Sequence, residues 1–135
     1  MGGYRTMERV EADLWSEKIN YLLGSCALNT VDPVDLLIGT YQVLKTGPSG
    51  ICGSIRPGIS HSQLQLLLDC GAFESAALRL LERCGYMLSR SSEGAVIASV
   101  VISSSERDYS FNAASEEIAL CGALMVCLQE SVTDG

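Results

Sequence analysis

Apolar residues at the start of the chain recur every three or four positions, which is the spacing of one side of an α-helix. The pattern predicts an amphipathic helix over residues 6–23 that ends at Gly24. The opposite side of this helix carries charged residues, and we expect that side to face water. The apolar residues expected to face the core are Val10, Leu14, Trp15, Ile19, Tyr21 and Leu22.

Three further helices are predicted in the first two thirds of the chain. One spans 33–45 and begins after Asp32, whose carboxylate can accept a hydrogen bond from the first turn. Another opens at Ser60, with Gln63 in the capping-box position. The last of the three spans 73–83, where apolar residues again recur at helical spacing.

The pattern then changes from helical to strand-like. Strands are predicted over 86–90, 95–103 and 109–113, joined by short turns at 91–94 and 104–108. Connections this short favour an antiparallel meander. Apolar residues occupy both faces of the middle strand, which indicates that both faces of the sheet are covered.

A helix over 115–129, with Ser115 as its N-cap, ends the predicted fold. Every residue over 118–128 is apolar or glycine, and eleven such residues are too few to span a bilayer. This helix should be buried, covered by other helices of the chain or by a second subunit. The candidate residues for a contact between subunits are Leu120, Leu124 and Met125.

These elements predict a single α+β domain over residues 1–135. A small three-stranded antiparallel meander is sandwiched by helices within 73–129, and the part over 6–70 adds two or three N-terminal helices. The chain has 47% hydrophobic and 19% charged residues, a composition that excludes intrinsic disorder.

The balance of charge narrows the class of partner. Nine Lys and Arg against 16 Asp and Glu give a net charge of -7. An acidic chain is unsuited to bare nucleic acid or anionic lipid, whereas it can attract a basic protein. The acidic residues of the first helix that we expect in a partner contact are Glu8, Glu11 and Glu17.

Six cysteines raise the question of disulfides. The first residues lack the apolar core of a signal peptide, so we expect the host cytosol, where thiols stay reduced. No spacing typical of a zinc site is present, and most of the cysteines lie in helical patterns, where a thiol behaves as a small buried hydrophobe. We expect no metal and no cofactor.

His61, the one histidine, suggests a thiol-dependent or histidine-dependent enzyme as one hypothesis. An imidazole can activate a thiol, and Cys52 and Cys70 lie near His61 in the sequence. No nucleophile motif surrounds these residues, and an exposed histidine at a helix start is the simpler interpretation. No catalytic residue is therefore assigned.

The segment 47–59 is rich in glycine and proline and is predicted to be a loop. It lacks the sequence of a phosphate-binding loop, and Arg56 is its one cation. Exposed loops often carry binding residues. We therefore expect Gly50, Ile51 and Arg56 to contact a protein partner.

The second half of the chain resembles a known family. A helix ending in Cys84-Gly85-Tyr86 is followed by a hairpin around Glu93-Gly94 and by the segment 112–124, Asn-Ala-Ala-Ser-Glu-Glu-Ile-Ala-Leu-Cys-Gly-Ala-Leu. Over about residues 73–129 this succession is similar to the phage ABA-sandwich domain of small phage and prophage proteins. The resemblance implies helices flanking a small antiparallel sheet and no catalytic residue that could be carried over.

Two non-catalytic hypotheses therefore stand beside the enzyme hypothesis. The first is a small acidic phage or prophage accessory protein that acts through protein contacts. The second is an inhibitor of a bacterial defence or nucleic-acid-handling complex, whose acidic surface would block a basic groove. The buried C-terminal helix also favours a homo-oligomer.

Overall fold

The computed structural model describes residues 2–28, 31–102 and 108–134, and the side chains within 13–28, 31–102 and 108–131. This part of the chain forms an α+β fold, which confirms the predicted fold class. In chain order its elements are α1 (Gly2–Leu28), α2 (Pro33–Thr46), α3 (Ser49–Cys52), α4 (His61–Asp69), α5 (Phe73–Leu80), β1 (Gly85–Arg90), β2 (Val96–Val101), β3 (Tyr109–Ala113) and α6 (Glu116–Asp134).

The sheet is the predicted antiparallel meander, with strand order β1-β2-β3. Gly94 closes the β1–β2 hairpin with a φ of +90°, a conformation that glycine adopts without steric cost. The turn predicted over 104–108 lies largely outside the described residues.

A helix covers one face of this sheet rather than both. Val96, Ala98 and Val100 of β2 are buried toward α6, which packs on β2 and β3. The alternate residues of β2 are only half-buried, and Met87 of β1 is 70% exposed. The expectation that helices cover both faces is therefore wrong, because moderately apolar strand residues can also lie at a protein surface.

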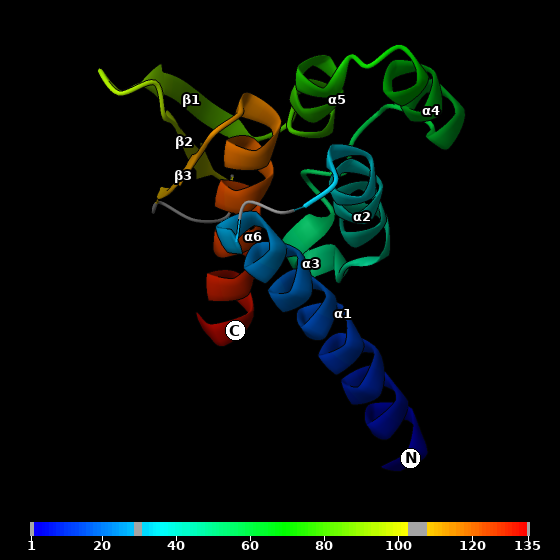
Figure 1. Ribbon diagram of the computed structural model, residues 1–135. Coiled ribbons are helices and arrows are strands. Elements are labelled where there is room, and N and C mark those ends of the chain that lie inside the picture. Colours follow the sequence, from blue (N-terminus) through cyan, green and yellow to red (C-terminus); the bar gives the residue numbers. More distant parts are fainter. Residues whose placement is uncertain (1, 29–30, 103–107, 135) are drawn as a thin grey trace.

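Helix α6 is the centre of the molecule. It packs against α1, α2, α5 and the sheet, and Figure 1 shows it between the sheet and the other helices. Its core-facing residues Leu120, Leu124 and Met125 have no exposed surface. The expectation that these residues form a contact between subunits is wrong, because the chain's own elements cover them completely.

Helix α1 continues beyond the predicted end at Gly24 and divides the predicted apolar stripe between two sides. Trp15, Ile19 and Leu22 are buried, and Cys26 extends the same side by one turn. Leu14 and Tyr21 lie on the other side and are exposed, which contradicts the prediction for them. The remaining member of the stripe, Val10, lies outside the described side chains.

The predicted helix starts agree with the structure at α2 and α4 and disagree at α6. Val34 N–H donates to the Asp32 carboxylate at 2.9 Å, and Ser60 and Gln63 form the complete capping box of α4. The Oγ of Ser115 is buried and has no hydrogen-bond partner, so Ser115 does not cap α6 with its side chain as predicted.

Candidate functional site

The outer face of α1 carries large apolar side chains that are not covered by any other part of the chain that the structure describes. Leu14 is 60% exposed, Tyr21 73% and Leu28 74%. The other large apolar side chains found exposed in the described part are Leu66, Tyr86 and Met87, on α4 and β1. Half of this set therefore lies on one face of one helix. We call Leu14, Glu17, Tyr21, Gly24 and Leu28 the outer stripe of α1.

Helix geometry aligns the outer stripe. Seven residues fall about 20° short of two full turns, so Leu14, Tyr21 and Leu28 lie almost in line along the helix. Glu17 and Gly24 fill the positions between them. A Cβ added to Gly24 would meet no atom within 4 Å. Glycine in a helix interior costs about 1 kcal/mol relative to alanine, and packing within this chain gives no reason for it here.

The inner face of α1 fixes where the outer stripe points. The Trp15 indole is buried, and its Nε1–H donates to the Val43 carbonyl of α2 at 2.9 Å. Lys18 donates to the Gln42 side chain, and Asn20 accepts from Gln129 of α6. Contacts with both α2 and α6 thus prevent the helix from rolling its apolar stripe inward.

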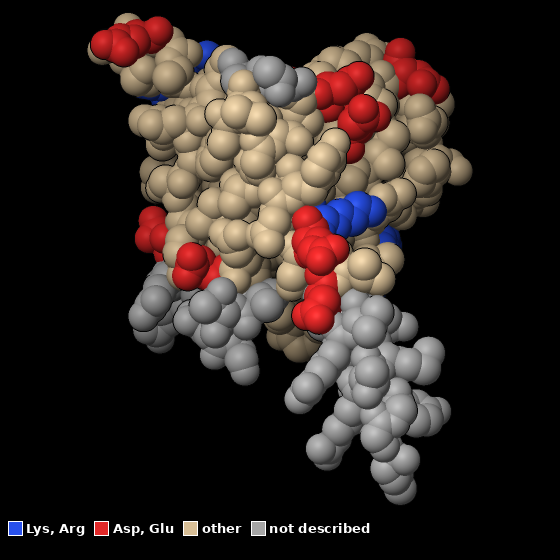
Figure 2. Space-filling model, turned by 60° about the horizontal axis from the view of Figure 1, so that its bottom comes forward, with Lys and Arg blue, Asp and Glu red and all other residues tan. Residues whose placement is uncertain are grey.

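Most charges left for a partner are acidic, because the cations of the described part largely bind their own chain. Figure 2 shows the acidic side chains in several separate groups with a broad uncharged area between them. Glu17 is exposed on the outer stripe, while Glu8 and Glu11 lie on α1 outside the described side chains. The cation contacts are Lys18 to Gln42, Lys45 to Pro57, Arg56 to Lys45 and Gly47, Arg79 to Glu82 and Arg90 to Glu116.

The predicted partner loop is packed more firmly than a free loop. Ile51 lies in the short helix α3 and packs partly against the core, whereas Gly50 is exposed. The Arg56 guanidinium donates to the carbonyl oxygens of Lys45 at 2.9 Å and Gly47 at 3.0 Å. Arg56 therefore fastens the segment 47–59 to the end of α2. Sequence reasoning missed this role, which no local pattern reveals.

The structure does not bring the hypothetical catalytic pair together. His61 is the first residue of α4 and Cys70 directly follows its last residue, so the helical rise places them about 13.5 Å apart along the axis. Cys52 is fully buried, and burial raises the pKa of its thiol to about 11. The His61 ring instead lies edge-on to the Tyr41 ring, with centroids 6.0 Å apart.

The buried thiols are core residues rather than nucleophiles. Burial raises the pKa of Cys26 and Cys84 to about 11 and that of Cys121 and Cys127 to about 12, so all four stay protonated at neutral pH. Cys70 is the exposed thiol. Among residues 2–28, 31–102 and 108–134, no group of three or more His, Cys, Asp or Glu is arranged to hold a metal ion.

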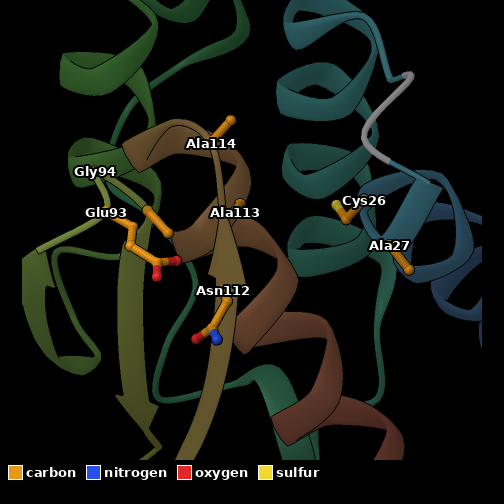
Figure 3. A pocket seen from close by; sticks show the side chains of 8 residues that line it. Cys26, Ala27, Glu93, Gly94, Asn112, Ala113 and Ala114 are labelled. Carbon is orange, nitrogen blue, oxygen red and sulfur yellow. The ribbon is translucent and has the colours of Figure 1, made fainter. Parts of the chain in front are cut away.

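Two open pockets lie beside the sheet, and neither brings together a catalytic set. One, of about 460 Å³, has Cys26 and Ala27 of α1 across from Glu93, Asn112 and two alanines at the end of β3 and beyond it (Figure 3). The other, of about 270 Å³, is lined by Glu74, Leu88, Ser89, Val96 and the ion pair between Arg90 and Glu116.

The sequence contains the signal for the outer stripe, although the helical pattern predicts two of its members, Leu14 and Tyr21, in the core. Leu14, Tyr21 and Leu28 recur at seven-residue spacing, and Leu28 lay beyond the predicted end of the helix. No helix in the described residues has the length and apolar character needed to cross a membrane. Comparisons with models of protein families, with curated proteins and with solved structures gave no match.

Proposed function

We propose that this protein acts by binding another protein through the outer stripe of α1, without catalysis. The observation that carries the proposal is the alignment of Leu14, Tyr21 and Leu28, each at least 60% exposed, on a helix whose opposite side is anchored in the core. Large apolar side chains that are exposed together on one helix face are typical of a surface that contacts another protein. Tyrosine at its centre suits such a surface, since its ring packs while its hydroxyl stays hydrated.

The proposal agrees with the class of protein that the resemblance to the phage ABA-sandwich domain implies. A small phage or prophage accessory protein acts through contacts of this kind, with no cofactor and no catalytic residue. The part similar to the phage ABA-sandwich domain, about residues 73–129, would then serve as the framework that holds α1.

Photo-crosslinking from the outer stripe tests the proposal in cells. A benzoyl-phenylalanine in place of Tyr21 should form covalent adducts with a protein, and adding Leu28→Glu should abolish them. The same photoreactive residue in place of Leu66 is the matched control, because Leu66 is 65% exposed on a different helix. Absence of adducts from position 21, or equal adducts from both positions, would contradict the proposal.

A second candidate function is inhibition of a complex with a basic groove. The favouring observation is that cations such as Arg79 and Arg90 are paired within the chain, while Asp13 and Glu17 are exposed on α1. Binding of this kind should weaken steeply as salt rises, because exposed charges are screened. Affinity for a captured basic partner that stays constant between low and high salt would rule it out.

A further inference from the structure

We infer that the protein bound by the outer stripe of α1 is a second copy of this chain, in an antiparallel helix pair with its two-fold axis at Tyr21. The inference rests on the proposed function and names its partner. In the pair, Tyr21 meets Tyr21 of the other copy, and each Leu14 meets a Leu28.

The stripe has the self-complementarity that a two-fold contact requires. In such a contact, residues equally distant from the axis on either side face one another. Leu14 and Leu28 lie seven residues before and after Tyr21, and both are leucines with similar exposure. An axis at Tyr21 therefore joins leucine to leucine on both sides. Seven-residue spacing is also the repeat of helices that pack side by side over several turns.

Charges along α1 select the antiparallel orientation. The charged residues of its described side chains, Asp13, Glu17 and Lys18, precede residue 19, and none occurs over 19–28. A parallel pair would place Glu17 against Glu17 and Asp13 against Asp13, which repel. In the antiparallel pair Glu17 faces Ser25 of the other copy instead. Antiparallel alignment also sets the opposite ends of the two helix dipoles together.

Gly24 allows the two helices of the proposed pair to approach closely. It lies three residues after Tyr21, on the same face, with open space above it in the single chain. The absence of a side chain at Gly24 leaves room beside Tyr21 for the helix of the other copy to approach closely. The cost of glycine inside a helix is thereby offset by a closer approach of the two helices.

The contact is small, which sets the expected affinity. The exposed outer positions of α1 that can take part are Asp13, Leu14, Glu17, Tyr21, Gly24 and Leu28. A standard stable interface uses about 20–30 residues a side. We therefore expect a weak dimer with a dissociation constant above about 1 µM. Figure 1 shows the N-terminal end of α1 projecting away from the rest of the molecule.

Sedimentation equilibrium measures the predicted dimer. From about 1 µM to about 1 mM protein, the average mass should rise from 14.4 kDa toward twice that value. Tyr21→Glu places two like charges at the axis and should hold the mass at that of a monomer throughout. Leu66→Glu, the same kind of change on α4, should behave as the unaltered protein. A constant monomer mass for the unaltered protein, or equal association of Tyr21→Glu, would overturn the inference.

Crosslinking of introduced thiols tests the orientation. In a Cys70→Ser background, which removes the exposed thiol, Leu14→Cys and Leu28→Cys chains are mixed and treated with a short bis-maleimide. The antiparallel pair predicts crosslinks between one chain of each kind and few within either alone. Crosslinks that form equally well within each variant alone would contradict it, because a parallel pair gives that result.

The photo-crosslinking experiment separates failure of this inference from failure of the proposed function. Adducts of twice the chain mass support the second copy as the partner. Adducts of another mass from position 21, with a monomer in sedimentation, overturn this inference and leave the proposed function standing. No adducts at all overturn both.

Discussion

Leu14 and Trp15 are neighbours in the sequence, yet Leu14 is 60% exposed and Trp15 only 7%. Both are apolar, so hydrophobicity alone does not decide which one faces the core. The indole has the larger apolar surface to bury, and its N–H finds the Val43 carbonyl at 2.9 Å. Turning Leu14 inward would expose that surface and break the bond.

Trp15→Phe tests this account of α1. The change removes the only donor of the side chain and part of its volume, so we expect the free energy of unfolding to fall by about 1–2 kcal/mol in urea denaturation. The loss stays moderate because Val43 O also accepts from Gly47 N–H at 3.0 Å. Tyr21→Phe is the control and should change stability by less than about 0.5 kcal/mol. Equal effects of the two variants would show that Trp15 does not anchor the helix.

Arg56, which is predicted to contact a partner, also stabilises the fold. Arg56→Met keeps an unbranched apolar side chain and removes the bonds to the carbonyl oxygens of Lys45 and Gly47. We expect a loss of about 1 kcal/mol in stability and faster amide hydrogen exchange over 47–59. Arg56→Lys should be more stable than Arg56→Met but less stable than the unaltered protein, because an ammonium group lacks the planar set of donors of a guanidinium. Unchanged exchange in Arg56→Met would show that this contact does not hold the segment.

At the scale of elements, Gly122 of α6 packs against the Phe111 ring of β3. A Cβ added there would lie 2.6 Å from a ring carbon of Phe111, too close for an ordinary contact. Gly122→Ala should therefore destabilise the fold by about 1–3 kcal/mol in urea denaturation, since the ring must move. Combining Gly122→Ala with Phe111→Leu should restore part of the lost stability, because the smaller side chain makes room for the added Cβ. The matched change Gly24→Ala, with open space above it, should stabilise a dilute sample by up to about 1 kcal/mol.

Local signals in the sequence were sufficient to predict elements with strong caps and alternation. Asp32 and Ser60 mark helix starts because their oxygens accept bonds within the first turn, and β2 follows from its alternating apolar residues. The short helix α3 was missed, since Gly50 lowers its helical propensity and burial of Cys52 stabilises it instead. Packing against residues far along the chain decides whether such a short segment becomes helical. That packing cannot be inferred from the local sequence pattern.

The candidate site was predictable only in part for the same reason. Apolar residues on α1 form two stripes, and the sequence does not say which one the other helices will cover. The choice depends on Val43 and on α6, which lie far along the chain. The exposure of Glu17 was predicted correctly, whereas Leu14 and Tyr21, which share its face of the helix, were predicted in the core.

At the scale of the whole molecule, the buried thiols tie global stability to alkaline pH. Burial raises the pKa of five thiols from 9.0 to about 11 or about 12. As pH rises past 9, the unfolded chain loses these protons while the folded chain retains them. The contribution of the protonated thiols to the free energy of unfolding is therefore fully present below pH 9, and it is lost as the pH rises from 9 to about 11 or about 12. The thiols lie on α1, α3 and α6 and, at Cys84, directly before β1. The loss of stability therefore affects the whole core at once.

We therefore expect one cooperative unfolding transition in far-UV circular dichroism as pH rises above 9. Cys121→Ala removes a fully buried thiol, so the free energy of unfolding should fall less between pH 8 and pH 10 than in the unaltered protein. Cys70→Ala is the matched control, because Cys70 is exposed and its removal should leave that difference unchanged. If Cys121→Ala and the unaltered protein lost the same free energy over this interval, ionisation of the buried thiols would not be what limits stability in alkali.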